Sequence, residues 1–163
     1  MILQLLQEGD PFLLESTPEF LFDGQIDPEL LSQDLVETMN HHGAFGLAAN
    51  QCGLDMRVFV LAPLPDDDNP IICFNPQIIS VSENEANDLE GCLSFPDLVL
   101  SIPRSILVNV QYQNEKGEII ETVFTNLHAR GFLHELDHLN GIVFTSHVSK
   151  LKLDMAKKKR SKR

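Results

Sequence analysis

The sequence predicts a single α+β domain. Three observations indicate this class: a helical pattern near the start, a β-rich centre, and a second helical pattern near the end. A chain of 163 residues is long enough for one hydrophobic core, and its apolar content of 43% is that of an ordinary globular protein. Helices that flank a run of strands, instead of alternating with them, are typical of the α+β class.

A first helix is expected from Asp27 to about His42. Asp27 is a preferred N-cap residue, and Pro28 suits the first helical position because the proline lacks an N–H that the helix would leave unpaired there. Apolar residues then recur at helical spacing: Leu30, Leu31, Leu35 and Met39. We expect this stripe to be part of the core.

Five strands are expected in the centre, because five short segments are rich in β-branched or aromatic residues. They are residues 57–62, 71–74, 77–82, 106–112 and 118–125. Residues 63–70, with three consecutive aspartates, are expected to form a loop, and residues 114–117 a hairpin turn. A second helix should then run from about Asn126 to Leu139.

The stretch His134-Glu135-Leu136-Asp137-His138 is the most informative motif of the chain. Histidines four residues apart lie on one face of a helix, so both imidazoles can reach the same metal ion. Glu135 lies beside them, where a carboxylate can take a proton from a metal-bound water. The motif therefore predicts a metal-dependent hydrolase, provided that a third ligand exists. The alternative is a surface helix that carries two histidines and two acids.

The third ligand is not evident downstream. The longer metalloprotease pattern asks for a histidine where Phe144 stands, and no glutamate follows Glu135. Upstream, Cys92 stands out within Glu90-Gly91-Cys92-Leu93-Ser94. A thiolate together with two imidazoles suits iron, zinc, cobalt or nickel. Three protein ligands would leave one position open for water, which is the catalytic arrangement.

Three blocks of the chain, in the same order, resemble those of the peptide deformylase family. Residues 46–51 resemble the family's G-x-G-L-A-A-x-Q, residues 90–94 match E-G-C-L-S, and residues 134–141 match H-E-x-D-H-L-x-G. The similarity runs from about residue 3 to about residue 148. Ala44 and Leu133 depart from the pattern, which has a glycine and commonly a glutamine there, and both departures bear on the substrate pocket.

The resemblance implies a peptide deformylase-like fold, with antiparallel or mixed β-sheets around a central metal-binding helix. It implies a hydrolase that removes the N-formyl group from the N-terminal formylmethionine of nascent polypeptides and releases formate. Cys92, His134 and His138 would bind one divalent metal ion per chain. Fe²⁺ is the expected native metal, with Zn²⁺, Ni²⁺ and Co²⁺ as alternatives.

The resemblance also implies roles for individual residues. Glu135 would accept a proton from the attacking water and pass it to the leaving amine. The Gln51 side-chain amide and the backbone N–H of Leu93 would stabilise the oxyanion, and Glu90 would pair with Arg104 behind the metal site. The expected substrate-binding residues are Phe45, Gly46, Glu90, Gly91, Leu127, Arg130 and Gly131. For Phe45 and Leu127, a place in the ordinary core is the alternative.

Charge is distributed unevenly along the chain. Residues 150–163 hold eight of the twelve basic residues and one acid, a net charge of +7, which leaves −19 for residues 1–149. We therefore divide the chain into a catalytic domain, residues 1–149, and a short basic C-terminal tail, residues 150–163. The acidic body disfavours general nucleic-acid binding, whereas the tail could bind ribosomal RNA phosphates. A solvated, disordered end is the alternative, since the thin apolar pattern of the tail does not favour a long stable helix.

Other features narrow the function classes. No apolar stretch approaches the ~20 residues that a membrane span needs, and the N-terminus lacks the basic start of a signal peptide. Cys52, Cys73 and Cys92 show no paired framework, which fits a reducing cytoplasm. We expect a cytoplasmic enzyme with no membrane or DNA partner. Two alternatives remain: a ribosome-associated or nucleic-acid-associated module with a structural metal, which needs a fourth ligand, and a peptidase, which lacks its downstream ligand.

Overall fold

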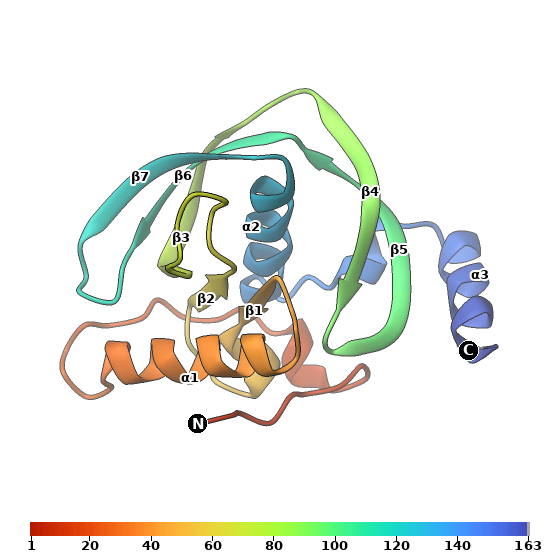
Figure 1. The fold of residues 1–163 in the computed structure, drawn as a ribbon. Coiled ribbons are helices and arrows are strands. Elements are labelled where there is room, and N and C mark those ends of the chain that lie inside the picture. The colour runs from red at the N-terminus through yellow and green to blue at the C-terminus, as the bar shows by residue number, and fades with distance from the viewer. Residues whose placement is uncertain (163) are drawn as a thin grey trace.

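Two antiparallel sheets surround helix α2 (Asn126–Leu139) in the computed structural model of the chain, which describes residues 1–162 (Figure 1). The larger sheet has the strand order β1-β2-β3-β6-β7, and β4 and β5 form a separate two-stranded ribbon. The strands are β1 (Gly46–Ala48), β2 (Val58–Leu61), β3 (Ile71–Val81), β4 (Glu85–Cys92), β5 (Phe95–Ser105), β6 (Leu107–Gln113) and β7 (Ile119–Thr125). The expected α+β class is confirmed.

Both long helices begin and end as the sequence indicates. Helix α1 (Pro28–His41) is capped by Asp27, whose side chain accepts hydrogen bonds from the backbone N–H groups of Glu29 and Leu30. Helix α2 ends at Leu139 because Gly141 adopts a positive φ of 71°, a conformation that favours glycine. In the apolar stripe of α1, Leu30 is exposed, which differs from the expected core position.

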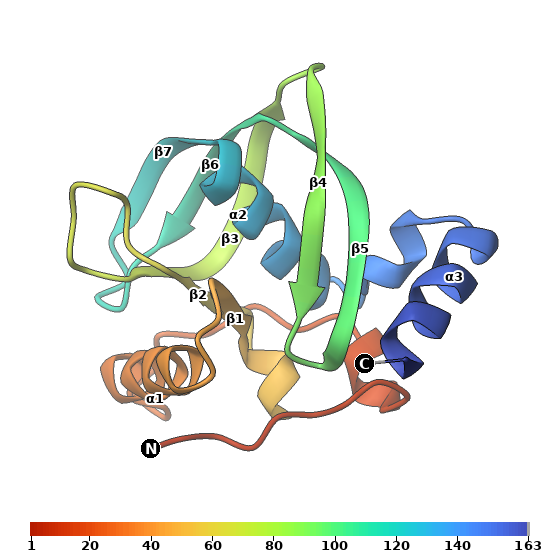
Figure 2. The ribbon, with the colours of Figure 1, turned by 45° about the vertical axis from the view of Figure 1, so that its right-hand side comes forward.

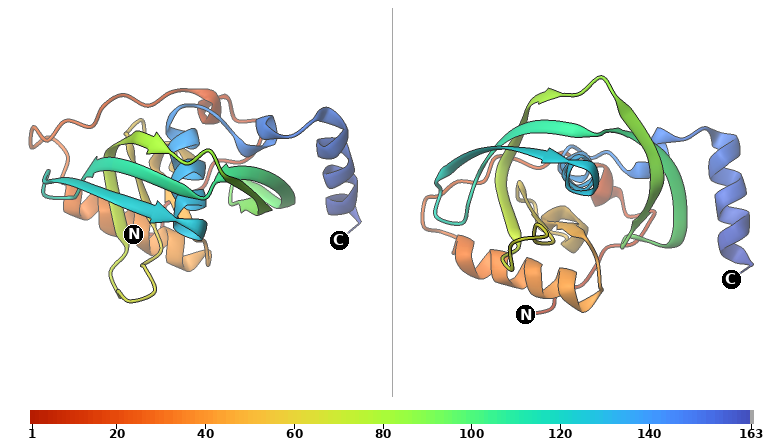
Figure 3. Two further views of the ribbon diagram at one scale, coloured as in Figure 1. Left: turned by 90° about the horizontal axis from the view of Figure 1, so that it is seen from above. Right: turned by 45° about the horizontal axis from the view of Figure 1, so that its top comes forward.

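The core lies on both faces of the five-stranded sheet. Phe59 and Leu61 of β2 belong to the cluster that packs against α2. Val58 and Val60 of the same strand belong to the cluster that includes residues of α1. Because its two faces are covered, β2 has four consecutive buried residues. The right panel of Figure 3 shows α2 end-on between this sheet and the β4–β5 ribbon.

The β4–β5 ribbon was missed by the sequence analysis. Strand β4 is mostly exposed, with Glu90 as its one buried residue, and β5 contains Pro96 and Pro103. Prolines argue against a central strand, but a two-stranded ribbon has only edge strands, in which a missing N–H is tolerated. Alternation does appear in β5, where Leu98, Leu100 and Ile102 face inward.

One long strand replaces two of the expected short ones. Strand β3 runs through Asn75 and Pro76, where its pairing with β6 shifts register. Asn75 has a positive φ of 49°, and its side chain bonds to both backbone groups of Phe20 and to Gln113. The bulge explains why the strand pattern breaks at this point. The short strand β1 was also not expected.

The basic tail forms a helix, α3 (Lys150–Ser161), instead of lacking stable structure. Ser149 caps its first turn, and Leu153 and Ala156 pack against a cluster that includes Phe95 of β5 and Phe144. Figures 1 and 2 show α3 on the outer side of β5. Arg163 lies outside the described residues. Within residues 1–162, no helix is long and apolar enough to cross a membrane.

Candidate active site

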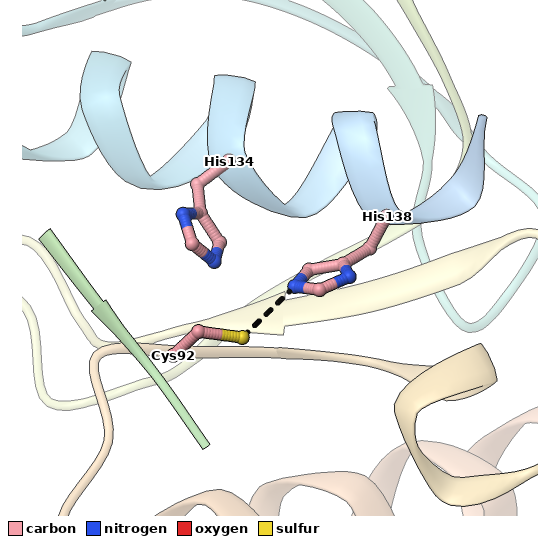
Figure 4. A group of neighbouring side chains, drawn as sticks. All are labelled: Cys92, His134 and His138. Carbon is pink, nitrogen blue, oxygen red and sulfur yellow. Dashed lines mark hydrogen bonds between the residues drawn. The ribbon is translucent and has the colours of Figure 1, made fainter. Parts of the chain in front are cut away.

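Helix α2 presents one face to the sheet and another to the β4–β5 ribbon. The sheet-facing residues are Ala129, Phe132, Leu136 and Leu139. His134 and His138, one turn apart, point together toward the end of β4 (Figure 4). Both histidines are buried, so the expected helical spacing has placed two imidazoles in one protected position.

Cys92, the last residue of β4, joins the two histidines. Its Sγ lies 3.3 Å from Nε2 of His138, and the ligand atoms of Cys92, His134 and His138 all lie within 4.8 Å of one another. A thiolate and two imidazoles form a donor set that suits a divalent transition metal or zinc. The structure therefore brings together the three residues that the sequence predicts as metal ligands.

Glu90 orients one of these histidines. Its Oε1 lies 2.8 Å from Nδ1 of His134, so the Nδ1–H donates to the carboxylate and Nε2 is left to bind an ion. Glu90 also accepts hydrogen bonds from Nε and Nη2 of Arg104, each at 3.0 Å, as expected, and from Nη1 of Arg130 at 2.6 Å. Burial opposes ionisation of Glu90, but hydrogen bonds from His134 and Arg104 lower its pKa to about 2. The carboxylate thus stays charged and fixed behind the site.

The two histidines differ in their electrostatic environment. Burial lowers the pKa of His138 well below its ordinary value, so this histidine is neutral. Burial acts in the same direction on His134, but hydrogen bonds to Cys92 and Glu90 raise its pKa to about 10. An ion that binds Nε2 of His134 would displace a proton from that nitrogen, because metal sites bind histidine in its neutral form.

Glu135 lies in the wall of the same site. Its side chain is buried, and Oε2 has no hydrogen-bond partner among the described residues. Burial raises the pKa of Glu135 to about 7, which suits a group that exchanges protons near neutral pH. Gly46 passes so close that a Cβ there would lie 2.6 Å from Oε1 of Glu135.

Gln51 is held with its amide NH₂ toward the site. Its Oε1 accepts the backbone N–H of Ala48 at 3.0 Å, and this bond fixes the orientation of the amide. Nε2 lies 3.4 Å from Sγ of Cys92 and 3.3 Å from Oγ of Ser94. The Ser94 contact was not foreseen, although Ser94 lies in the second family block.

A pocket of about 650 Å³ opens over this group of residues. All the residues expected in the site line the pocket except His138, which lies behind it. Phe45 both lines the pocket and packs against the core, so the two interpretations of that residue are not exclusive. Leu127 is half exposed at the pocket, and of the two family departures Ala44 lines the pocket whereas Leu133 packs against the core.

Several residues near the site were not foreseen. Nδ2 of Asn50 donates to the backbone carbonyl of His138 at 2.5 Å. Asp137 accepts from Nη1 of Arg104 and pairs with Nε2 of His147, each at 2.7 Å. Asn50 and Asp137 lie inside the first and third family blocks, which is the signal that could have found them. His147, which the sequence analysis gave no role, has no such signal.

Arg130 lines the pocket, but its guanidinium is occupied. Beside its bond to Glu90, Nη1 donates to the carbonyl of Ile102 at 2.8 Å, and Nη2 donates to the carbonyl of Ala86 at 2.7 Å. The guanidinium therefore ties α2 to both strands of the ribbon.

Two histidines and a cysteine around one point, a buried carboxylate beside them and an open pocket define a metal-dependent hydrolase. Comparison with known proteins gives the family. The polypeptide deformylase family matches residues 2–154. A peptide deformylase of Thermotoga petrophila is 38% identical over 152 residues, which are 93% of this chain and 90% of that protein. One from Bartonella henselae is 38% identical over 157 residues, 94% of this chain and 88% of the relative.

Solved structures agree with this similarity. A peptide deformylase from Legionella pneumophila superposes with a TM-score of 0.89 at 32% identity, covering 99% of this chain and 95% of the other. A peptide deformylase from Acinetobacter baumannii with Met-Ala-Ser bound has a TM-score of 0.84 at 30% identity. The match covers 91% of this chain and 99% of the other. The chain belongs to the peptide deformylase family. It is a metal-dependent enzyme that removes the formyl group from N-terminal formylmethionine.

Proposed function

We propose that Cys92, His134 and His138 hold the divalent ion of this deformylase and that Glu135 is its proton-transfer group. The observation that carries the assignment is the convergence of the three ligand atoms within 4.8 Å, with Cys92 and His134 at the wall of the pocket that Glu135 also lines. When bound, the ion would act as a Lewis acid and lower the pKa of a water molecule. Three ligands leave it a position open to substrate.

The proton transfer is proposed to run through one carboxylate. Glu135 accepts a proton from the water that attacks the formyl carbon and delivers it to the leaving amine, so the products are formate and a free N-terminus. Gln51 Nε2 and the backbone N–H of Leu93 donate to the oxyanion, and each such donor is typically worth about 3 kcal/mol. The fixed orientation of the Gln51 amide supports this role.

The formylated peptide is proposed to bind between two strand edges. Within residues 1–162, β1 pairs only with β2, and β4 pairs only with β5, so each has an unpaired edge. Gly46 of β1 and Gly91 of β4 both line the pocket, and an extended peptide could pair with either edge. Phe45, Leu127 and Gly131 would surround the methionine side chain. The relative with Met-Ala-Ser bound supports a peptide of this kind.

We assign Glu90 and Arg130 to the support of this site. The Arg130 guanidinium is held by Glu90, Ile102 and Ala86, so its proposed role is to fix the carboxylate that orients His134. Such supporting hydrogen bonds typically contribute 10–100-fold to metal affinity or activity. Since its side chain is occupied, Glu90 would then contact the substrate through its backbone, at the unpaired edge of β4.

Formate release from formyl-Met-Ala-Ser, measured beside cleavage of unformylated Met-Ala-Ser, tests the activity. Formate with intact tripeptide is expected, whereas cleavage of the unformylated peptide would indicate a peptidase.

Elemental analysis tests the proposed metal ligands. Cys92→Ala should lose the ion, and the matched variants Cys52→Ala and Cys73→Ala should keep it. Stoichiometric metal of normal affinity in Cys92→Ala would refute the ligand assignment.

The ion itself is proposed to be Fe²⁺, with Zn²⁺, Ni²⁺ or Co²⁺ able to replace it, because all four accept thiolate and imidazole. Metal analysis of protein purified without oxygen identifies it. With iron, activity should decay in air and persist without oxygen, since both a ferrous ion and a thiolate are oxidisable. Zinc as the recovered metal, with activity stable in air, would overturn this choice.

A ribosomal contact is proposed for α3, keeping residues 1–149 as the catalytic domain. The exposed lysines of α3 and of the residue after it are six: Lys150, Lys152, Lys157, Lys158, Lys159 and Lys162. Phosphate contacts by such residues would make binding steeply salt-dependent. Replacing Lys157, Lys158 and Lys159 by Glu should weaken co-sedimentation with ribosomes at low salt without changing peptide deformylation.

A cytoplasmic location is also proposed, because Cys52, Cys73 and Cys92 are free thiols, which fits a reducing compartment.

A further inference from the structure

His147 ends a short turn, Phe144–His147, which follows α2 and does not line the pocket. Its Nε2 lies 2.7 Å from Oδ2 of Asp137, and the same oxygen accepts a hydrogen bond from Nη1 of Arg104, also at 2.7 Å. An imidazole with a proton on Nε2 donates such a bond in its neutral and its charged form alike. Asp137 therefore receives two donors on one oxygen, one from the surface and one from the interior.

Arg104 connects Asp137 to the carboxylate that orients His134. Its Nε and Nη2 each donate to Glu90 at 3.0 Å, and Oε1 of Glu90 lies 2.8 Å from Nδ1 of His134. The exposed fraction of the side chain falls from 35% at His147 to 20% at Asp137 and 6% at Arg104. A guanidinium is a rigid planar fork, so Asp137 limits the orientations in which Arg104 can hold Glu90. The series of contacts thus runs from the surface to a buried histidine of the metal site.

The same turn contacts His134 a second time. Phe144 is buried, and its ring packs against the His134 imidazole with centroids 5.7 Å apart at an interplanar angle of 60°. Phe144 also packs against Phe95 of β5, with centroids 5.4 Å apart. The turn is therefore anchored at its buried end, which holds His147, at the other end, against Asp137.

We propose that His147 is a positioning residue of the metal site. Its hydrogen bond to Asp137 fixes Arg104 and Glu90, and through them the direction in which His134 points Nε2. The direction of a ligating imidazole is set by the partner of its other nitrogen, so a looser partner lowers metal affinity. Because His134 is one of the three proposed ligands, this role rests on the proposed function and deepens it.

The Co²⁺-loaded protein tests this role, since transfer of Co²⁺ to a competing chelator gives the affinity and the visible absorption of the bound ion reports its ligand geometry. His147→Ala should weaken Co²⁺ binding about tenfold, the lower end of the effect typical of residues that support metal ligands, and should change the visible spectrum. His147→Gln keeps an N–H donor and should recover most of the affinity. The control is His41→Ala, because His41 is exposed at the end of α1 and packs against His42. That variant should bind Co²⁺ as the parent does.

Formate release from formyl-Met-Ala-Ser separates positioning from substrate binding. At full Co²⁺ occupancy, His147→Ala should lower kcat with little change in KM, because His147 does not line the pocket.

A double-mutant cycle with Asp137→Asn tests the route. If His147 acts through Asp137, His147→Ala should weaken Co²⁺ binding much less when position 137 is already Asn, because residues in one hydrogen-bond network are not additive. Unchanged Co²⁺ affinity in His147→Ala, an equal loss in His147→Ala and His147→Gln, or additive effects in the cycle would overturn the positioning role. A parent chain that holds no stoichiometric Co²⁺ would instead overturn the proposed ligands.

Discussion

At the scale of single residues, Glu135 combines burial with freedom from other partners. It follows His134 directly in α2, but its Oε2 has no hydrogen-bond partner among the described residues. The Glu135→Gln variant keeps the shape of the side chain and removes the proton acceptor. Turnover should fall by about 10²–10⁴-fold, the typical contribution of such a group. Elemental analysis should show full metal occupancy, and near-normal turnover at that occupancy would contradict the assigned role.

Gly46 lies against the same carboxylate. A Cβ there would be 2.6 Å from Oε1 and 3.0 Å from Cγ of Glu135, and 2.9 Å from Cδ2 of Leu61. Gly46→Ala should therefore displace Glu135 while Cys92 and the histidines still bind metal. A shift of about 1 Å in a catalytic group can cost ~10²-fold in rate. We expect kcat on formyl-Met-Ala-Ser to fall by at least tenfold at full metal occupancy; an unchanged kcat would show that the carboxylate adjusts without loss.

At the scale of elements, α3 packs against the rest of the chain through two partly buried apolar residues, Leu153 and Ala156. Leu153 packs against the β5 cluster, whereas Leu151, two residues earlier, is 70% exposed. Leu153→Ala should lower the free energy of unfolding by about 1–2 kcal/mol, less than a fully buried leucine would, because the side chain is only partly covered. Urea denaturation measures the change, with Leu151→Ala as the matched control, which should be within about 0.5 kcal/mol of the parent. Equal effects in the two variants would mean that α3 does not rest on β5 through Leu153.

At the scale of the whole molecule, the metal site joins two parts of the fold that are far apart in the sequence. Cys92 comes from the β4–β5 ribbon and both histidines come from α2, so a bound ion links the ribbon to the helix that the large sheet covers. An ion at 1,000 times its dissociation constant stabilises the folded state by about 4 kcal/mol. Removing it with a chelator should lower the melting temperature by roughly 10 °C. Calorimetry before and after chelation, followed by re-addition of the ion, checks this; an unchanged melting temperature would show that the ion contributes nothing to folding.

The sequence by itself determined the features that depend on local spacing. The 3.6-residue period places His134 and His138 on one face of α2, and Asp27 followed by Pro28 starts α1 where expected. The three family blocks also singled out Gln51, Cys92 and Glu135, which all line the pocket.

The tertiary structure alone decided the features that depend on burial between distant segments. Strand β4 is almost wholly exposed and β5 contains two prolines, so their pairing with each other was not evident from the sequence. The packing of α3 was likewise not evident, because its thin apolar pattern does not show that Leu153 and Ala156 meet β5. Phe45 and Gly131, which both line the pocket, are 86 positions apart in the chain. The close approach of two such residues is decided only by the folded chain. Helical and strand periods carry no information about which distant surfaces meet.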